Sequence, residues 1–271
     1  MTLSASRHRN RGWRYLSEGR ETDVKADITR PLPARRRHPA EPSAESADNR
    51  WRGLYRVAGA AAWITVALTL AAIVAHIAWP PPDWSAGFAA DWFARFGESW
   101  LLGLLGLDLM IAISLVLGVP IFLALYIVLR RAGESTMLIA TAVALLGTVL
   151  HLVSNTSFEM LSLSEGYAAA TTDLQRAVFI AAGEATLAAY KGTAFYVSYV
   201  LGYAARIAIG LVMLRSTAFG RTTAHVGILA GVAGFGLFVP SVGLLLSILS
   251  VVFIAVWNAL IARAFFRLAR A

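Results

Sequence analysis

The sequence contains no cysteine and few charged residues. None of its 271 residues is Cys, which excludes disulfides, thiolate metal sites and a cysteine nucleophile. Charged residues make up 15% of the chain, against about 25% in soluble domains. The chain also lacks a GxSxG motif, a Walker A motif and a GxGxxG motif after a strand. No catalytic residue, metal site or cofactor is therefore predicted, and an enzyme is the less favoured class.

What the sequence has in abundance is apolar residues. Hydrophobic residues account for 58% of the chain, and the mean hydropathy is +0.63. Soluble domains contain about 45–50% apolar residues. This composition indicates an integral membrane protein of the all-α class, in contact with the lipid bilayer along most of its length.

The N-terminal region, residues 1–52, is polar, and it carries 12 of the 24 Lys and Arg residues. It has too few apolar residues to offset the entropy of ordering, so we expect a disordered, Arg-rich cytoplasmic tail. It has no apolar h-region and is not a secretory signal peptide. The cluster Arg35, Arg36 and Arg37 favours contact with anionic lipid headgroups, and no nucleic-acid partner is expected.

Residues 53–271 contain six apolar segments of a length suited to membrane crossing, which takes about 20 residues. Their approximate bounds are 54–79, 100–129, 137–164, 193–214, 223–239 and 242–262. Pro80, Pro81 and Pro82 end the first segment, and Gly118-Val119-Pro120 is expected to break the second. The sequence thus predicts a polytopic bundle of about six transmembrane helices.

Two further helices are expected outside the crossings. Residues 83–98 carry aromatic residues four positions apart, which is typical of a short interfacial helix. These aromatic residues are Trp84, Phe88, Trp92 and Phe96. A plain anchoring loop and a lid over a site are the alternatives. The residues Thr172-Asp-Leu-Gln175 form a capping-box pattern, which begins an outer amphipathic helix that we separate from the fourth crossing near Gly192.

The basic residues predict the orientation of the bundle. One set of connections and the C-terminal tail hold Arg130, Arg131, Arg215, Arg221, Arg263, Arg267 and Arg270. The opposite connections hold only Arg95, Arg176 and Lys191. Because short cytoplasmic loops are enriched in Lys and Arg, we expect a bacterial inner-membrane protein with both termini in the cytoplasm.

A few polar residues interrupt the apolar segments. His151, Asn155 and Glu159 are four positions apart and share one face if they lie on one helix. The helix rise of about 1.5 Å per residue places them in the outer half of the bilayer, at a depth shared with other polar residues. These are His76, Asp108 and Lys191. Arg206 lies nearer the inner end, where it reaches the interface or pairs with an acid or a lipid phosphate.

Several interpretations of these residues stay open. In the simplest interpretation, the charged side chains near the outer interface are hydrated and form loose ion pairs. These are Asp108, Glu159 and Lys191. In the second, the polar residues form an outward-facing cluster that binds or moves a small solute or ion. A metal-dependent intramembrane hydrolase is a distant alternative, because the tight ligand spacing of HExxH is missing.

Gly227-xxx-Gly231 in the fifth segment permits close helix approach. Packing within the bundle is the ordinary explanation of this spacing. It also leaves open a structural or regulatory membrane protein that acts through helix packing and partner binding, including assembly as a homo-oligomer.

The chain also resembles a bacterial family of multi-spanning membrane proteins that is defined as a domain of unknown function. The resemblance covers residues 53–268. It rests on Leu107-Asp108, Pro120, Leu123-Ala-Leu-Tyr126, Arg130-Arg131, Tyr167-Ala-Ala-Ala-Thr-Thr-Asp173, Gly192-Thr-Ala-Phe195, Met213-Leu-Arg-Ser216 and Phe219-Gly-Arg221. It implies an integral inner-membrane protein and transfers no activity, ligand or catalytic residue.

Overall fold

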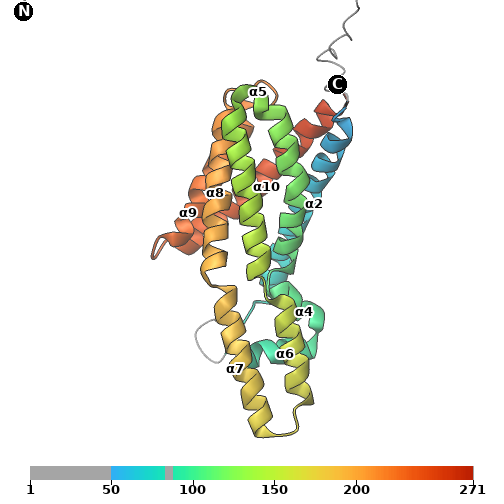
Figure 1. The fold of residues 1–271 in the computed structure, drawn as a ribbon, viewed down its shortest axis with the longest axis vertical. Helices are drawn as coiled ribbons and strands as arrows, with labels where there is room; N and C mark the ends of the chain where they lie inside the picture. Colours follow the sequence, from blue (N-terminus) through green and yellow to red (C-terminus); the bar gives the residue numbers. More distant parts are fainter. Residues whose placement is uncertain (1–49, 83–87, 271) are drawn as a thin grey trace, which may run out of the picture. The chain divides into compact units, whose positions relative to one another are not determined.

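The structure is a computed structural model that describes residues 50–82 and 88–270. This part of the chain is helical apart from turns and contains no strand, which confirms the all-α class (Figure 1). Four helical stretches are long and apolar enough to cross a membrane: Arg52–Ala78, Leu109–Ala169, Asp173–Met213 and Leu245–Leu268. Their length and apolar composition fit a membrane protein. The predictions for the tail with its Arg35–Arg37 cluster and for Trp84 lie outside the described residues.

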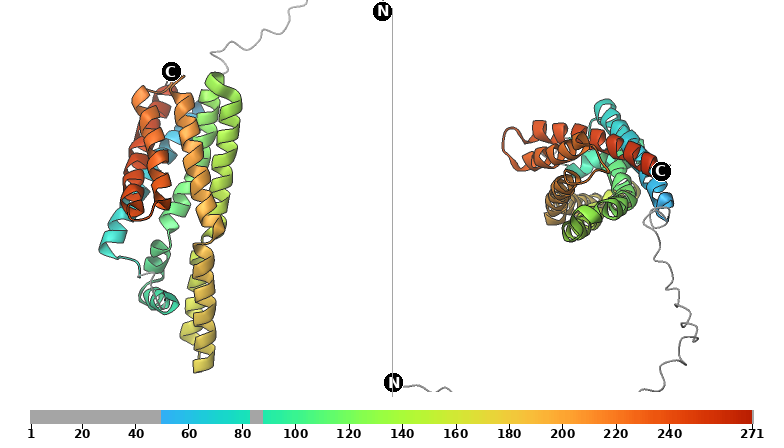
Figure 2. Two further views of the ribbon diagram at one scale, coloured as in Figure 1. Left: turned by 90° about the vertical axis from the view of Figure 1, so that its left-hand side faces the viewer. Right: turned by 90° about the horizontal axis from the view of Figure 1, so that it is seen from above.

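Five helices form a ring in which each packs against the next and the last returns to the first. In ring order they are α2 (Arg52–Ala78), α5 (Leu109–Ser154), α8 (Thr193–Met213), α9 (Arg221–Phe235) and α10 (Gly243–Leu268). A short 3-10 turn, η1 (Gly236–Phe238), follows α9. The core of this bundle is apolar and includes the fully buried Leu125, Met137 and Phe265. The view from above in Figure 2 shows the helices arranged around it.

Helix α5 is a hairpin of two arms rather than one straight rod. Gly133 is the one residue within α5 whose backbone is not helical, and the two arms lie side by side in Figure 1. The first arm runs beside α2 and the second beside α8. The turn lies between Arg131 and Met137, where the sequence predicted that one apolar segment ends and the next begins.

The predicted break at Gly118-Val119-Pro120 is wrong, because α5 continues through Pro120. A proline removes one backbone hydrogen bond, and packed neighbouring helices can compensate for it. The break comes earlier, at Leu107 and Asp108, between α4 (Trp100–Gly106) and α5. The proline therefore predicted the wrong position for the helix break in this segment.

The remaining helices form a second compact group, which we term the cap. The cap consists of α3 (Phe88–Glu98), α4, α6 (Ser157–Ala169) and α7 (Asp173–Tyr190), which pack against one another. The predicted capping box at the start of α7 is confirmed, with Thr172 accepting from the Gln175 amide and Gln175 accepting from Thr172. The separation of α7 from α8 next to Gly192 is also as predicted.

The aromatic residues of α3 have a packing role in the cap. Trp92 and Phe96 are 0% and 5% exposed, and with Phe93 they build the cap core. The sequence assigned Trp92 and Phe96 to an interfacial stripe. Their spacing showed that they share a face, but not that α6 and α7 cover it, because those helices come some 60 residues later in the sequence.

Candidate functional site

Three helix breaks meet where the cap joins the bundle, and we call this region the break layer. The breaks lie at Leu107–Asp108 between α4 and α5, at Asn155–Thr156 between α5 and α6, and at Lys191–Gly192 between α7 and α8. Figure 1 shows the three interruptions at one level of the molecule. Hydrogen bonds from Asn155 to Leu107 and from Tyr190 to Asp108 join them directly.

Side chains from the second break replace a bond missing at the first. The carbonyl oxygen of Leu107 accepts from the Asn155 side-chain amide at 2.9 Å. The buried Ser157 hydroxyl lies 2.7 Å from that carbonyl and 2.7 Å from Asn155 Oδ1, so both oxygens are within reach of its single proton. Asp108 has a left-handed backbone, with φ of 64°, which a continuous helix does not allow. The break is therefore fixed by specific bonds.

The third break depends on a glycine. A Cβ atom at Gly192 would lie 2.8 Å from the carbonyl oxygen of Ala189, closer than carbon and oxygen atoms approach. The backbone N–H of Gly192 donates to that carbonyl at 2.9 Å. Glycine thus permits the tight turn that separates Tyr190 and Lys191 from α8.

Asp108 lies at the centre of the break layer. Its carboxylate accepts a hydrogen bond from the hydroxyl of Tyr190, which is buried at the end of α7. The carboxylate also interacts electrostatically with His151, Lys191 and Tyr199. Asp108 is half-buried, and a carboxylate can accept about four hydrogen bonds. It therefore keeps capacity for a further partner.

His151 occupies the last turn of α5 and is 4% exposed. Its Nδ1 atom lies 3.2 Å from Ser198 Oγ on α8. Its Nε2 atom is buried and has no hydrogen-bond partner among the described residues. Most buried polar atoms are paired, so this nitrogen is a candidate for chemistry.

Phe195 on α8 holds the aromatic side of the layer together. Its ring centroid lies 4.8 Å from that of Tyr199, 5.6 Å from that of Tyr190 and 5.7 Å from that of His151. The distances are those of packed aromatic pairs. The rings of Tyr190 and His151 are thereby both held against the ring of Phe195.

The structure brings four of the seven predicted site residues together. Asp108, His151, Asn155 and Lys191 belong to the break layer. Glu159 does not, because α5 ends at Ser154 and Glu159 lies exposed on α6. The expectation that His151, Asn155 and Glu159 share one continuous helix is therefore wrong.

The other two predicted residues lie elsewhere. His76 is exposed near the end of α2, with Nδ1 3.3 Å from the carbonyl oxygen of Ala72. Arg206 packs between α8 and α10, its guanidinium carbon 5.4 Å from the centroid of the Trp257 ring. Arg206 Nε has no partner among the described residues.

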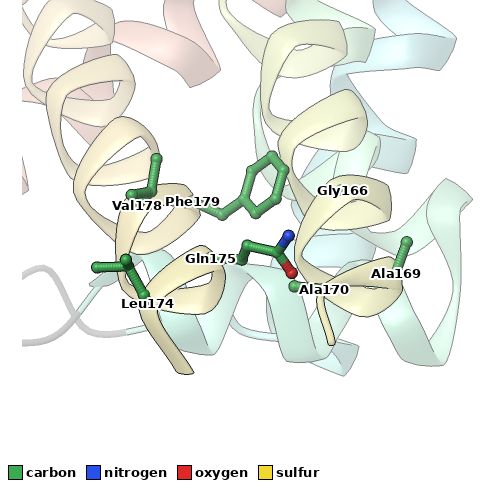
Figure 3. Close-up of a pocket in the computed structure, with 7 residues that line it drawn as sticks. All are labelled: Gly166, Ala169, Ala170, Leu174, Gln175, Val178 and Phe179. Carbon is green, nitrogen blue, oxygen red and sulfur yellow. The ribbon is translucent and has the colours of Figure 1, made fainter. Parts of the chain in front are cut away.

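A surface pocket of about 550 Å³ opens at the far end of the cap, between α6 and α7 (Figure 3). It is lined by Gly166, Ala169, Ala170, Leu174, Gln175, Val178 and Phe179. Its polar side chain, Gln175, is already engaged with Thr171 and Thr172 in capping α7. The pocket therefore offers apolar surface and little chemistry.

Within residues 50–82 and 88–270, no three His, Cys, Asp or Glu side chains lie close enough together to hold a metal ion. The described residues thus provide no donor set for the metal-dependent hydrolase. Comparison with known proteins adds no assignment, since no family model, curated protein or solved structure matches the chain. The function is therefore argued from the break layer itself.

Proposed function

We propose that this membrane protein binds or moves a small solute or ion at the break layer. The observation that carries the proposal is that three interrupted helices meet around one half-buried carboxylate, Asp108. In membrane proteins, interrupted helices at membrane depth occur where they are covered by protein or line a site. Transporters place their substrate and ion sites at such interruptions.

The polar residues support the same proposal. An ionisable residue within a membrane bundle is costly, and function is the usual reason for its presence. Asp108 and the unpartnered Nε2 of His151 supply two acceptors, and Tyr190 and Asn155 supply donors that are already engaged. This set suits a small polar ligand better than an apolar one.

In the proposed arrangement the chain crosses the bacterial inner membrane six times, with both termini in the cytoplasm. The crossings are α2, α4 with the first arm of α5, the second arm of α5, α8, α9 and α10. The α5 turn and the α8–α9 connection contribute to one end of the bundle core, together with the start of α2 and the end of α10. The arginines that we assign to the cytoplasm gather at that end, which agrees with the positive-inside rule.

Native mass spectrometry of the protein in mild detergent tests the binding proposal. We expect the wild-type protein to retain a non-protein mass, or to acquire one from a panel of small polar solutes and ions, and Asp108→Asn to lose it. Glu159→Gln is the matched control, since it removes an exposed carboxylate outside the layer and should bind as the wild type does. Equal binding by all three proteins, or binding by none, would overturn the proposal.

The glycine spacing that suggested the structural alternative lies at contacts between helices of the same chain. A Cβ atom at Gly227 would lie 2.6 Å from Trp257 Nε1 of α10, and one at Gly231 would lie 2.9 Å from the carbonyl oxygen of Tyr203 in α8. Both glycines thus serve packing within the chain.

The subunit number in the native mass spectra tests assembly as a homo-oligomer. The family resemblance noted in the sequence adds no ligand to either proposal.

A further inference from the structure

The tautomer of His151 follows from the donors and acceptors around Ser198. The Ser198 hydroxyl oxygen lies 2.6 Å from the carbonyl oxygen of Phe195 and 3.2 Å from His151 Nδ1. A carbonyl oxygen only accepts, so the single hydroxyl proton of Ser198 is donated to Phe195. Ser198 Oγ must then accept from His151, and Nδ1 carries the ring hydrogen.

A neutral imidazole has one N–H nitrogen and one nitrogen with a lone pair. Because Nδ1 carries the hydrogen, the lone pair of His151 is on Nε2. This atom is fully covered and lacks a hydrogen-bond partner among the residues that the structure describes. The protein therefore holds a base in a fixed orientation and leaves its accepting atom unused.

The charged and titratable groups that act on this base come from each element around it. Asp108 comes from the junction of α4 and α5, and its carboxylate interacts with the His151 ring. Tyr190 and Lys191 from the end of α7 and Tyr199 from α8 interact with the same carboxylate. Burial of the ring disfavours a positive charge on the imidazole, and the negative charge of Asp108 opposes that effect.

We infer that the ion bound at the break layer is a proton, taken up on His151 Nε2 and stabilised there by the Asp108 carboxylate. The inference rests on the proposed function and names its ligand. A metal ion or an organic cation needs space next to its acceptor, and Nε2 is completely covered. A proton adds almost no volume. The imidazole becomes imidazolium, the acid in solution that supplied the proton becomes its conjugate base, and Tyr190 keeps its hydroxyl hydrogen to hold Asp108 in place.

Nitrogen-15 NMR of the full chain, labelled in its histidine rings and reconstituted in lipid, tests both steps. The His151 signals are identified by their absence in His151→Gln. We expect Nδ1 to be protonated and Nε2 unprotonated at high pH, and Nε2 to gain a proton on acidification. Ser198→Ala should remove the tautomer preference. Asp108→Asn should weaken proton binding roughly tenfold or more, and Glu159→Gln should leave it unchanged.

A hydrogen on Nε2 at high pH, a ring that does not titrate, or equal titration in Asp108→Asn would overturn the inference. If His151→Gln does not fold, the Ser198→Ala variant identifies the His151 signals instead, because His151 is the histidine whose tautomer changes in that variant. If a solute is retained in an Asp108-dependent way while His151 never titrates, the proposed function stands and the proton inference falls. If neither is seen, both fall.

Discussion

At the residue scale, the carbonyl of Leu107 shows how the break layer is held. In a continuous helix this oxygen would accept from the backbone four residues later. Here Asn155 and Ser157 approach it instead, at 2.9 and 2.7 Å. A polar backbone atom in an apolar bundle must be paired, so these side chains make the interruption stable.

This role predicts a contrast between two neighbouring hydroxyls. Ser157→Ala removes bonds to Leu107 and Asn155 and should lower stability by about 1–3 kcal/mol. Thr156→Val is the matched control, because Thr156 Oγ1 is buried and has no partner among the described residues. Its effect should be within roughly 0.5 kcal/mol. Thermal unfolding in one detergent measures both, and equal losses would contradict the assignment of these bonds.

The sequence could identify only part of the site at this scale. Asp108, His151, Asn155 and Lys191 stand out because polar residues are rare in apolar segments. Phe195 does not stand out, because an aromatic residue in a membrane helix is ordinary. Ser198 gave no signal either, since its role depends on a neighbour 47 positions away, and no local period connects the two.

At the element scale, α9 depends on close contact with its neighbours. A methyl group at Gly231 would lie 2.6 Å from Ile207 Cγ1 and 2.9 Å from the backbone oxygen of Tyr203. The backbone contact cannot be relieved by turning a side chain. The helix must therefore move away from α8 to accept any larger residue.

We expect Gly231→Ala to cost about 1–3 kcal/mol through overpacking. Gly202→Ala in α8 is the control, because a methyl group there would meet no atom within 4 Å and alanine is the better helix former by about 1 kcal/mol. Melting temperatures should fall for the first variant and hold or rise for the second. A fall of equal size in both would show that contact at Gly231 is not the cause.

Helix boundaries were predicted well where a local signal exists. The Thr172–Gln175 box begins α7, and Gly192 separates α7 from α8. The break at Leu107–Asp108 was missed, because its cause is a pair of side chains some 50 residues away. Pro120 was given too much weight, since the loss of one hydrogen bond does not end a well-packed helix.

At the scale of the whole molecule, the ring and the cap have separate cores. The bundle core contains Leu125 and Phe265, and the cap core contains Trp92 and Met160. The six predicted crossings were derived from the lengths of the apolar segments. The structure has four long apolar helical stretches, which agree with a membrane protein. The length of an apolar segment does not show whether its helix faces lipid or packs against other helices, so the cap could not be predicted in this way.

The proposed orientation predicts which loops face the cytoplasm. Because the chain contains no cysteine, single cysteines can be labelled without background. Thr217→Cys, in the exposed α8–α9 connection, should resist a membrane-impermeant maleimide in intact cells. Thr171→Cys, in the exposed α6–α7 connection, should react. Both should react after permeabilisation, and the reverse pattern in intact cells would invert the orientation.

The ring has a consequence for how the protein is made. The helices of the ring pack in the order of synthesis, from α2 through α5, α8 and α9 to α10, and the contact of α10 with α2 joins the parts of the ring that are farthest apart in the sequence. A nascent chain can therefore build the ring one neighbour at a time as each helix leaves the ribosome. Every cap helix is complete by Tyr190. His151 can contact Ser198 only once α8 has been synthesised. The imidazole of His151 is therefore oriented after the cap helices are complete.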